Sequence, residues 1–420
     1  MGVGTDTGGS IRNPSSFANI YGMRPSKGLV STAGILPLKN YKDTAGPMTR
    51  TAEDMALLLE VMAGTDAGDD YTLEANADWI VGDGYMDDIS DSGLKGVRIG
   101  YLSYSFNTEY SSPDEKVRAM LDRAIACLEE AGAEVVDISD ILTTEEIESL
   151  TGDLGTETFE YDLNKYLHEK GDAAKYKTVR DLLYSNYDGT MHMYLANLTA
   201  DYYDLAGSFE ETYDPYTETV GQFKRTPCWA KALEGRLQVS KIMEDNDIDA
   251  VMYLNFFDIA TQEEAYVEDD YNYANYDIAF SAKLGLTEIS LPMGFSDAAD
   301  DNEAEMPLGL SLFSGYGRDV KLLDIAYAYE RQAGDSIRRM PEITPPLADT
   351  ALNGFLLDLI AEARSLGSEY RVAMGEIIQP VLDACDRSEK TDMSDPYAVY
   401  AAAGELAEEY DRAVQLTGGS

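Results

Sequence analysis

The chain has 420 residues, a length that suits one large domain with an appendage or two to three domains. Its 77 acidic and 32 basic residues give a net charge of −45, which opposes binding to nucleic acid or to an anionic lipid surface. No apolar run approaches the roughly 18 residues that span a bilayer, so no transmembrane segment is expected. Neither a disulfide framework nor a metal site is predicted from the spacing of Cys127, Cys228, Cys385, His168 and His192.

The main chemical signal is a glycine-rich stretch near the start of the chain, GTDTGGSIR at residues 4–12. Two consecutive glycines allow backbone conformations that a Cβ would forbid, so several N–H groups can turn toward one point. Ser10 then lies beside a set of N–H donors, and acyl transfer needs such a hydroxyl next to an oxyanion hole. Taken alone, the stretch is also consistent with a tight turn of small residues.

The segments around this stretch resemble the amidase signature family. The resemblance rests on GTDTGGSIRNPSSF at residues 4–17, YGMRPSKGLVS at 21–31 and DTAGPMTR at 43–50, and it returns near residues 290–315. Members of that family hydrolyse carboxamides with a Ser–cis-Ser–Lys triad. The resemblance therefore implies an amide hydrolase with no metal and no organic cofactor, acting on a small amide.

The resemblance also assigns roles to residues of the stretch. Ser10 matches the family's nucleophile. Asp6 and Arg12 match polar residues that brace the loop. The oxyanion hole is matched by the backbone N–H groups of Thr7, Gly8, Gly9 and Ser10.

The sequence departs from the family where the proton acceptor is expected. In the family, the Lys base lies well upstream of the nucleophile, and the bridging cis-Ser lies in a second Gly/Ser-rich loop between them. Only nine residues precede Ser10 here, and none of them is Lys or Ser. We therefore expect a C-terminal portion of an amidase, inactive or weakly active alone because a hydroxyl without a base is a poor nucleophile. We also expect self-association through the surface that the missing part leaves uncovered.

The first third of the chain is predicted to alternate strands and helices. Short strand or turn pieces are expected at Phe17–Tyr21 and Gly28–Ser31, and a loop is expected at Gly64–Asp78. The other predicted elements are a buried helix at Thr51–Ala63, a strand at Val97–Tyr101, a helix at Pro113–Glu130 and a strand at Glu134–Ile138. The β–α–β order of the last three favours an α/β domain with parallel pairing.

The middle of the chain, residues 144–246, is mostly helical in pattern and rich in tyrosine. In amidase-like enzymes this part helps to shape the substrate pocket; alternatively, the tyrosines cover the core and present hydroxyls to water. Glu264–Tyr276 lacks the Gly and the final Glu of a calcium loop, which favours an exposed acidic loop near the active-site mouth. The remaining predicted elements are strands at Asp249–Leu254, Ser290–Phe295 and Pro307–Phe313, followed by a helix at Lys321–Arg331.

A proline-rich boundary, Arg339–Leu347, separates the last part of the chain. Three amphipathic helices are expected beyond it, near residues 352–363, at Val372–Ala384 with an interruption at Pro380, and near 399–413. They make a small antiparallel bundle that resembles the helical repeats appended to bacterial cell-surface proteins. Together with the acidity of the chain, the bundle favours a cell-surface or secreted location, with the cytoplasm as the alternative.

The sequence as a whole predicts an α/β fold, a mixed and mostly parallel sheet flanked by helices. We expect an amidase-like domain at residues 1–338 without its N-terminal segment, a linker at 339–348 and a helical tail at 349–420. The predicted function is hydrolysis of a carboxylic amide through acylation of Ser10. A non-catalytic surface or interaction protein built on an amidase remnant is the alternative. A third possibility, an anion-binding module that uses the glycine loop, is disfavoured by the charge of −45.

Overall fold

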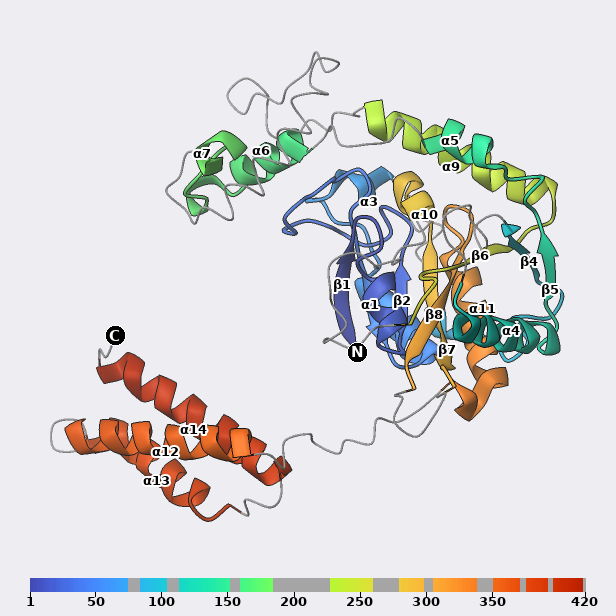
Figure 1. Ribbon diagram of the computed structural model, residues 1–420. Helices are drawn as coiled ribbons and strands as arrows, with labels where there is room; N and C mark the ends of the chain where they lie inside the picture. Colours follow the sequence, from blue (N-terminus) through green and yellow to red (C-terminus); the bar gives the residue numbers. More distant parts are fainter. Residues whose placement is uncertain are drawn as a thin grey trace. The chain divides into compact units, whose positions relative to one another are not determined.

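An eight-stranded mixed sheet organises the first of the chain's two units, Met1–Arg339 (Figure 1). The computed structural model describes residues 1–74, 84–103, 113–151, 159–183, 227–259, 279–297, 305–337, 350–370, 375–391 and 396–417. In sheet order the strands are β1 (Gly2–Asp6), β3 (Thr44–Thr49), β2 (Tyr21–Arg24), β7 (Glu288–Phe295), β8 (Pro307–Phe313), β6 (Ala250–Leu254), β4 (Arg98–Tyr101) and β5 (Glu134–Asp137).

Parallel pairing is confined to one end of this sheet. There β4 pairs in parallel with β5 and β6, as the β–α–β order in the sequence predicts. The other five pairings among the described strands are antiparallel. The mixed sheet is therefore confirmed, but the parallel majority is not found in the described part of the chain. The prediction extended one β–α–β unit to the whole sheet, whereas only 11 residues separate β7 from β8, fewer than a parallel crossover needs.

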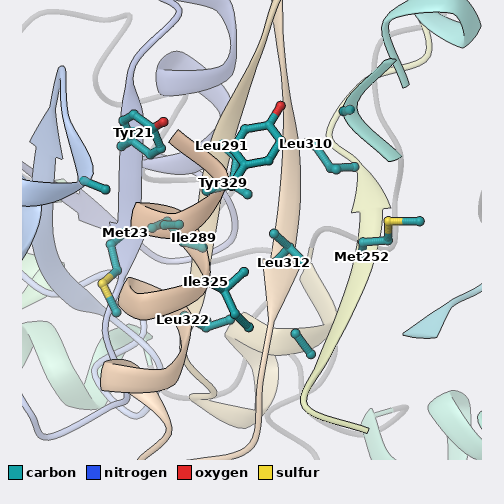
Figure 2. Packing of buried hydrophobic residues seen from close by; sticks show 14 of the residues in the cluster. Tyr21, Met23, Met252, Ile289, Leu291, Leu310, Leu312, Leu322, Ile325 and Tyr329 are labelled. Carbon is teal, nitrogen blue, oxygen red and sulfur yellow. The ribbon is translucent and has the colours of Figure 1, made fainter. Parts of the chain in front are cut away.

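One face of the sheet carries the main hydrophobic core. It is covered by α2 (Ala52–Met62), α4 (Glu115–Glu130) and α11 (Asp319–Ala333). Figure 2 shows strand residues of this face, among them Ile289, Leu291 and Leu312, packed against Leu322 and Ile325 of α11. These side chains are fully buried, and each contributes about 1.5–3 kcal/mol to folding relative to an exposed one.

The opposite face is partly polar and carries the glycine-rich stretch. It is covered by α1 (Arg12–Phe17), α5 (Thr144–Thr151), α9 (Pro227–Asp245) and α10 (Ala279–Leu284). Strand residues alternate between the faces, so Met252 belongs to the first core while Val251 and Tyr253 belong to the second. The remaining helices of the unit are α3 (Asp70–Glu74), α6 (Phe159–Glu169) and α7 (Val179–Leu183), with short 3-10 turns at Tyr85–Asp88, Gly171–Ala173 and Gly334–Ser336.

Most predicted elements appear within a few residues of their expected bounds. The helix expected at Thr51–Ala63 is α2, and its predicted start is held by the Thr51 side chain, which accepts a hydrogen bond from the Asp54 N–H at 2.9 Å. The loop expected at Gly64–Asp78 contains the helix α3, because the Asp69 carboxylate accepts a hydrogen bond from the Tyr71 N–H and starts a turn. Strands β1 and β3 and helix α1 were not predicted.

Several predictions fall on residues outside the described part of the chain. These are most of the tyrosine-rich region, at residues 184–226, the acidic segment Glu264–Tyr276 and the proline-rich boundary Arg339–Leu347.

The second unit, Met340–Ser420, is a bundle of three helices. These are α12 (Thr350–Tyr370), α13 (Gly375–Ser388) and α14 (Pro396–Thr417), and each contacts the other two. Their buried core contains Leu356, Ile378 and Leu406, each fully buried. None of the helices in the described ranges is long and apolar enough to cross a membrane.

Candidate active site

The glycine-rich stretch forms a loop that joins the end of β1 to the start of α1. Ser10 is exposed at this loop, whereas Asp6 before it and Arg12 after it are fully buried. Gly9 has a φ of +142°, which L side chains rarely adopt, and a Cβ there would lie 2.9 Å from Asn13 Nδ2. A Cβ on Gly8 would meet nothing within 4 Å, so open space adjoins the serine.

The Asp6 carboxylate holds the loop from the inside. It accepts hydrogen bonds from the Gly9 N–H at 2.9 Å and the Ile11 N–H at 3.1 Å. It also forms ion pairs of 3.0 Å with Arg12 Nε and with Arg24 Nη1. Burial by itself raises the pKa of Asp6, but attraction to Arg12 and then to Arg24 outweighs it and keeps that pKa well below its usual value. Asp6 therefore stays ionised and fixes both ends of the loop.

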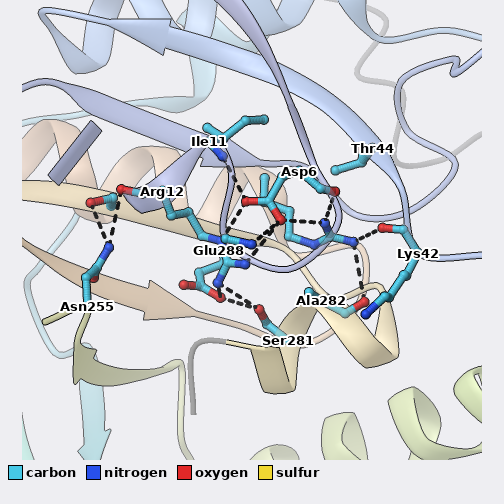
Figure 3. Close-up of polar contacts among 12 residues, drawn as sticks. Asp6, Ile11, Arg12, Lys42, Thr44, Asn255, Ser281, Ala282 and Glu288 are labelled. Atoms are coloured by element: carbon cyan, nitrogen blue, oxygen red, sulfur yellow. Dashed lines mark hydrogen bonds and ion pairs between the residues drawn. The ribbon is translucent and has the colours of Figure 1, made fainter. Parts of the chain in front are cut away.

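A second buried carboxylate, Glu288 at the start of β7, completes the network in Figure 3. Arg12 Nη1 lies 2.6 Å from Glu288 Oε2, and the hydroxyls of Tyr253 and Ser281 donate hydrogen bonds to the same carboxylate. Burial opposes the charge of Arg12, but Asp6 and Glu288 together raise its pKa well above the usual value. Two buried guanidinium groups thus face two buried carboxylates, and this balance allows four charges inside the unit.

The outer side of the loop is attached to the segment before β3. Thr7 Oγ1 donates a hydrogen bond of 2.6 Å to Asp43 Oδ1. Asp43 Oδ2 accepts two more hydrogen bonds, from the N–H groups of Leu38 and Lys39, each at 2.8 Å. Asp43 therefore connects the start of the glycine loop to residues 38–43. The loop is held from two directions, by Asp6 inside and by Asp43 outside.

The predicted oxyanion donors fall into two groups. The Gly9 N–H points inward to Asp6, so it has an acceptor in this conformation. Over the described ranges, no acceptor contacts the N–H groups of Thr7, Gly8 or Ser10. Backbone N–H groups without an acceptor next to an exposed hydroxyl can stabilise the negative charge that develops on a carbonyl oxygen.

Two lysines near the loop are buried. Burial lowers the pKa of Lys27 to about 8 and that of Lys42 to about 7. Lys27 Nζ lies 4.1 Å from the centre of the Tyr71 ring and donates a hydrogen bond of 2.8 Å to the Asp43 carbonyl. In the residues that the structure describes, no base forms a hydrogen bond with the Ser10 hydroxyl, and no acidic, histidine or cysteine cluster could hold a metal ion.

Sequence reasoning brought Asp6, Arg12 and Ser10 into one loop and missed three residues that contact it or its network. Arg24, Asp43 and Glu288 belong to β2, to the segment before β3, and to β7. The available signal was a charged residue at the end of a buried strand. Arg24 ends the strand YGMR, and Glu288 begins the strand EISLPMGF. Such a residue indicates an internal ion pair, although its partner is not readable from the sequence.

Comparison with known sequences places the loop in a family context. The family described as Amidase matches residues 1–323. A glutamyl-tRNA(Gln) amidotransferase subunit from Acinetobacter baumannii (strain AYE) is 30% identical over 342 residues, which cover 78% of this chain and 62% of the relative. The same subunit from Alkaliphilus metalliredigens (strain QYMF) is 28% identical over 351 residues, covering 81% and 64%. The chain thus spans a little under two thirds of the length of these relatives.

Solved structures give the same picture of the fold. The native peptide amidase from Stenotrophomonas maltophilia matches with a TM-score of 0.56 and 24% identity, over 81% of this chain and 63% of that one. An amidase family protein from Bacillus anthracis matches with a TM-score of 0.54 and 24% identity, over 81% and 57%. These likenesses concern the fold.

Proposed function

The chain belongs to the amidase family, and we propose that it hydrolyses a carboxylic amide through acylation of Ser10. The observation that carries this proposal is the geometry of the loop: an exposed serine hydroxyl beside backbone N–H groups that have no acceptor in the described part of the chain. The loop is held in place by a carboxylate that remains ionised. A fixed set of donors costs little reorganisation when the reaction develops charge.

In the proposed reaction, Ser10 Oγ attacks the amide carbon and gives up its proton to solvent water, and the carbonyl oxygen becomes an oxyanion. The N–H groups of Thr7, Gly8 and Ser10 donate to that oxygen, and each essential donor contributes about 3–4 kcal/mol. The amine then leaves with a proton, and water hydrolyses the resulting ester. In the conformation described, Gly9 supports the loop through Asp6 and does not donate to the oxyanion.

The proposed rate for the 420-residue chain alone is low. Since no base contacts the Ser10 hydroxyl over the described ranges, little alkoxide forms near neutral pH. Hydrolases that lose a member of their triad keep a residual rate, about 10³–10⁴-fold over water, from binding and the oxyanion hole. The expected behaviour is slow but selective reaction at Ser10.

This proposal is tested with an alkyl fluorophosphonate, whose phosphoryl oxygen needs the same donors. We expect slow labelling of Ser10 that speeds up with rising pH, located by peptide mapping. Ser10→Ala should remove the label, whereas Ser92→Ala, at an exposed serine outside the loop, should leave it unchanged. Labelling of Ser10 no faster than that of other exposed serines in the folded chain would contradict the proposal.

A further inference from the structure

Three lysines lie together beside the glycine loop of a very acidic chain. Lys39 and Lys42 precede β3, and Lys283 lies in α10. Lys39 and Lys42 share a turn, in which the Lys42 N–H donates to the Lys39 carbonyl at 2.9 Å. Arg24 Nη2 donates both to the Lys42 carbonyl and to the Ala282 carbonyl, which precedes Lys283. A group of cations is unexpected in a chain with 77 acidic and 32 basic residues. The group is linked to the glycine loop through Asp43, which accepts hydrogen bonds from the Lys39 N–H and the Thr7 hydroxyl.

Lys42 is the central residue of this group. The residue is only 7% exposed, and over the described ranges its ammonium group forms no hydrogen bond or ion pair, although it is not among the fully buried atoms. Its backbone carbonyl accepts a hydrogen bond from Arg24 Nη2, and in Figure 3 its side chain extends toward Ala282. Burial lowers the pKa of Lys42, repulsion from Lys39 and Arg24 lowers it further, and Asp43 opposes the shift. A mostly buried lysine among other cations is costly without an anion beside it.

The neighbouring carboxylates are already used by other groups. Asp43 accepts hydrogen bonds from the Thr7 hydroxyl and from two backbone N–H groups. Asp6 is shared by Arg12 and Arg24, and Glu288 is bound to Arg12. None of them forms an ion pair with Lys42 in the described structure.

The lysines are also connected to the reactive end of the loop. Lys39 and Thr7 both donate to the carboxylate of Asp43, so the segment that carries Lys39 and Lys42 is bound directly to the glycine loop. On the other side, the Ala282 carbonyl next to Lys283 accepts from Arg24 at 3.4 Å, and Arg24 in turn holds Asp6. The segments that carry the three lysines are therefore bound to the same loop that carries Ser10.

We propose that Lys42, together with Lys39 and Lys283, forms a subsite for a carboxylate group of the substrate, so that the preferred substrate is an amide that also carries a carboxylate. This inference rests on the proposed function. It narrows the substrate class from amides in general to anionic amides. A carboxylate would supply the Lys42 ammonium group with a charge-assisted hydrogen bond, which is stronger than a neutral one.

The test is a binding measurement that needs no catalysis. Calorimetry compares glutaramate, which has one primary amide and one carboxylate, with pentanamide, its uncharged counterpart. The wild-type chain should bind glutaramate at least 10-fold more tightly, and Lys42→Met should remove this preference. Lys241→Met is the matched control, since Lys241 is an exposed lysine on α9 that pairs with Asp245 at 2.7 Å. The control should keep the full preference.

The pH dependence gives a second readout. Since the pKa of free Lys42 is about 7, binding of an anion at pH 8 should be accompanied by proton uptake. The affinity for glutaramate should therefore fall between pH 7 and pH 9, while the affinity for pentanamide should not. Equal affinity for the two compounds, or a preference that survives in Lys42→Met, would overturn the proposal. Should Lys42→Met fail to fold, Lys283→Met provides the same comparison.

The outcome is separable from that of the proposed function. Ser10→Ala keeps all three lysines, so it should bind glutaramate with the same preference as the wild type. If this preference is present but the fluorophosphonate does not label Ser10, the subsite stands and the catalytic role of Ser10 fails. Selective labelling of Ser10 without any preference for glutaramate would support the catalytic role of Ser10 and overturn the carboxylate subsite.

Discussion

At the scale of single residues, the Asp6 carboxylate determines the shape of the glycine loop. It binds two backbone N–H groups of the loop and two arginines from α1 and β2, all in the interior of the unit. Removing one partner of a buried charge pair leaves the other charge without compensation. The shape of the loop therefore depends on a side chain that is fully buried.

Asp6→Asn should consequently lower the free energy of unfolding by about 3–5 kcal/mol, because Arg12 and Arg24 remain buried with an unmatched charge. Urea denaturation measures the change. Asp88→Asn, at an exposed carboxylate, is the control and should have a much smaller effect.

The same residue gives a pH signature. The pKa of Asp6 is lower in the folded state than its ordinary value of 3.8, so its stabilisation is complete above about pH 5 and is lost as the pH falls through and below 3.8. Asp6→Asn should show a flatter decline of stability between pH 5 and pH 3 than the wild type. Identical pH profiles for the two proteins would contradict the role assigned to this carboxylate.

The sequence predicted the centre of this network but not its periphery, for a physical reason. Asp6, Ser10 and Arg12 lie in one local motif, so their proximity follows from chain connectivity. Glu288 contacts Arg12 because β7 lies next to β2 in the sheet. Arg24 contacts the Lys42 carbonyl because the segment before β3 folds back beside β2. Such contacts depend on sheet order, which residue patterns do not encode.

At the scale of elements, the glycine loop connects β1 to α1, and its consecutive glycines, Gly8 and Gly9, have different roles. Gly9 has a φ of +142° and a close neighbour in Asn13, whereas Gly8 has neither feature. The φ of Gly9 directs its N–H toward Asp6. The two positions form a natural pair for comparison.

Gly9→Ala should destabilise the unit by about 1–3 kcal/mol, since an L residue at this φ is strained, and it should slow the labelling of Ser10. Gly8→Ala is the matched variant. Its new methyl group meets no atom within 4 Å, so the free energy of unfolding should change by less than about 1 kcal/mol. Chemical denaturation of both variants checks this, and equal losses of stability would contradict the distinction.

Element prediction succeeded where the hydrophobic period was long and failed where elements were short. The helices α2, α4 and α11 have 11 to 16 residues and a continuous apolar stripe, so their existence followed from the pattern. β1 reads GVGTD and is mostly exposed, and α1 has six residues with a proline in the middle. Neither segment shows a periodic pattern of apolar residues. Each is stabilised by contacts with elements far away in the sequence, which the local pattern does not reveal.

At the scale of the whole molecule, the hydrophobic cores of the chain's two units share no residue. The main cores of Met1–Arg339 lie on the two faces of the eight-stranded sheet, and that of Met340–Ser420 lies among α12, α13 and α14. The bundle core is built from side chains on α12, α13 and α14. A unit with its own core is expected to fold as an independent element of the chain.

The separate core of the bundle therefore predicts how a mutation in it should act. Leu406 of α14 is fully buried in the bundle, and Leu406→Ala should lower the stability of the bundle by about 2–5 kcal/mol through loss of contacts and a remaining cavity. Leu357→Ala is the matched control, because Leu357 on α12 is 57% exposed and the same truncation removes little buried surface.

Calorimetry of the full chain should show a transition that Leu406→Ala shifts to lower temperature and Leu357→Ala leaves in place. The transition of Met1–Arg339 should remain at the wild-type temperature in both variants, since its core contains neither residue. A single transition that moves as a whole in Leu406→Ala would instead mean that the two cores unfold cooperatively.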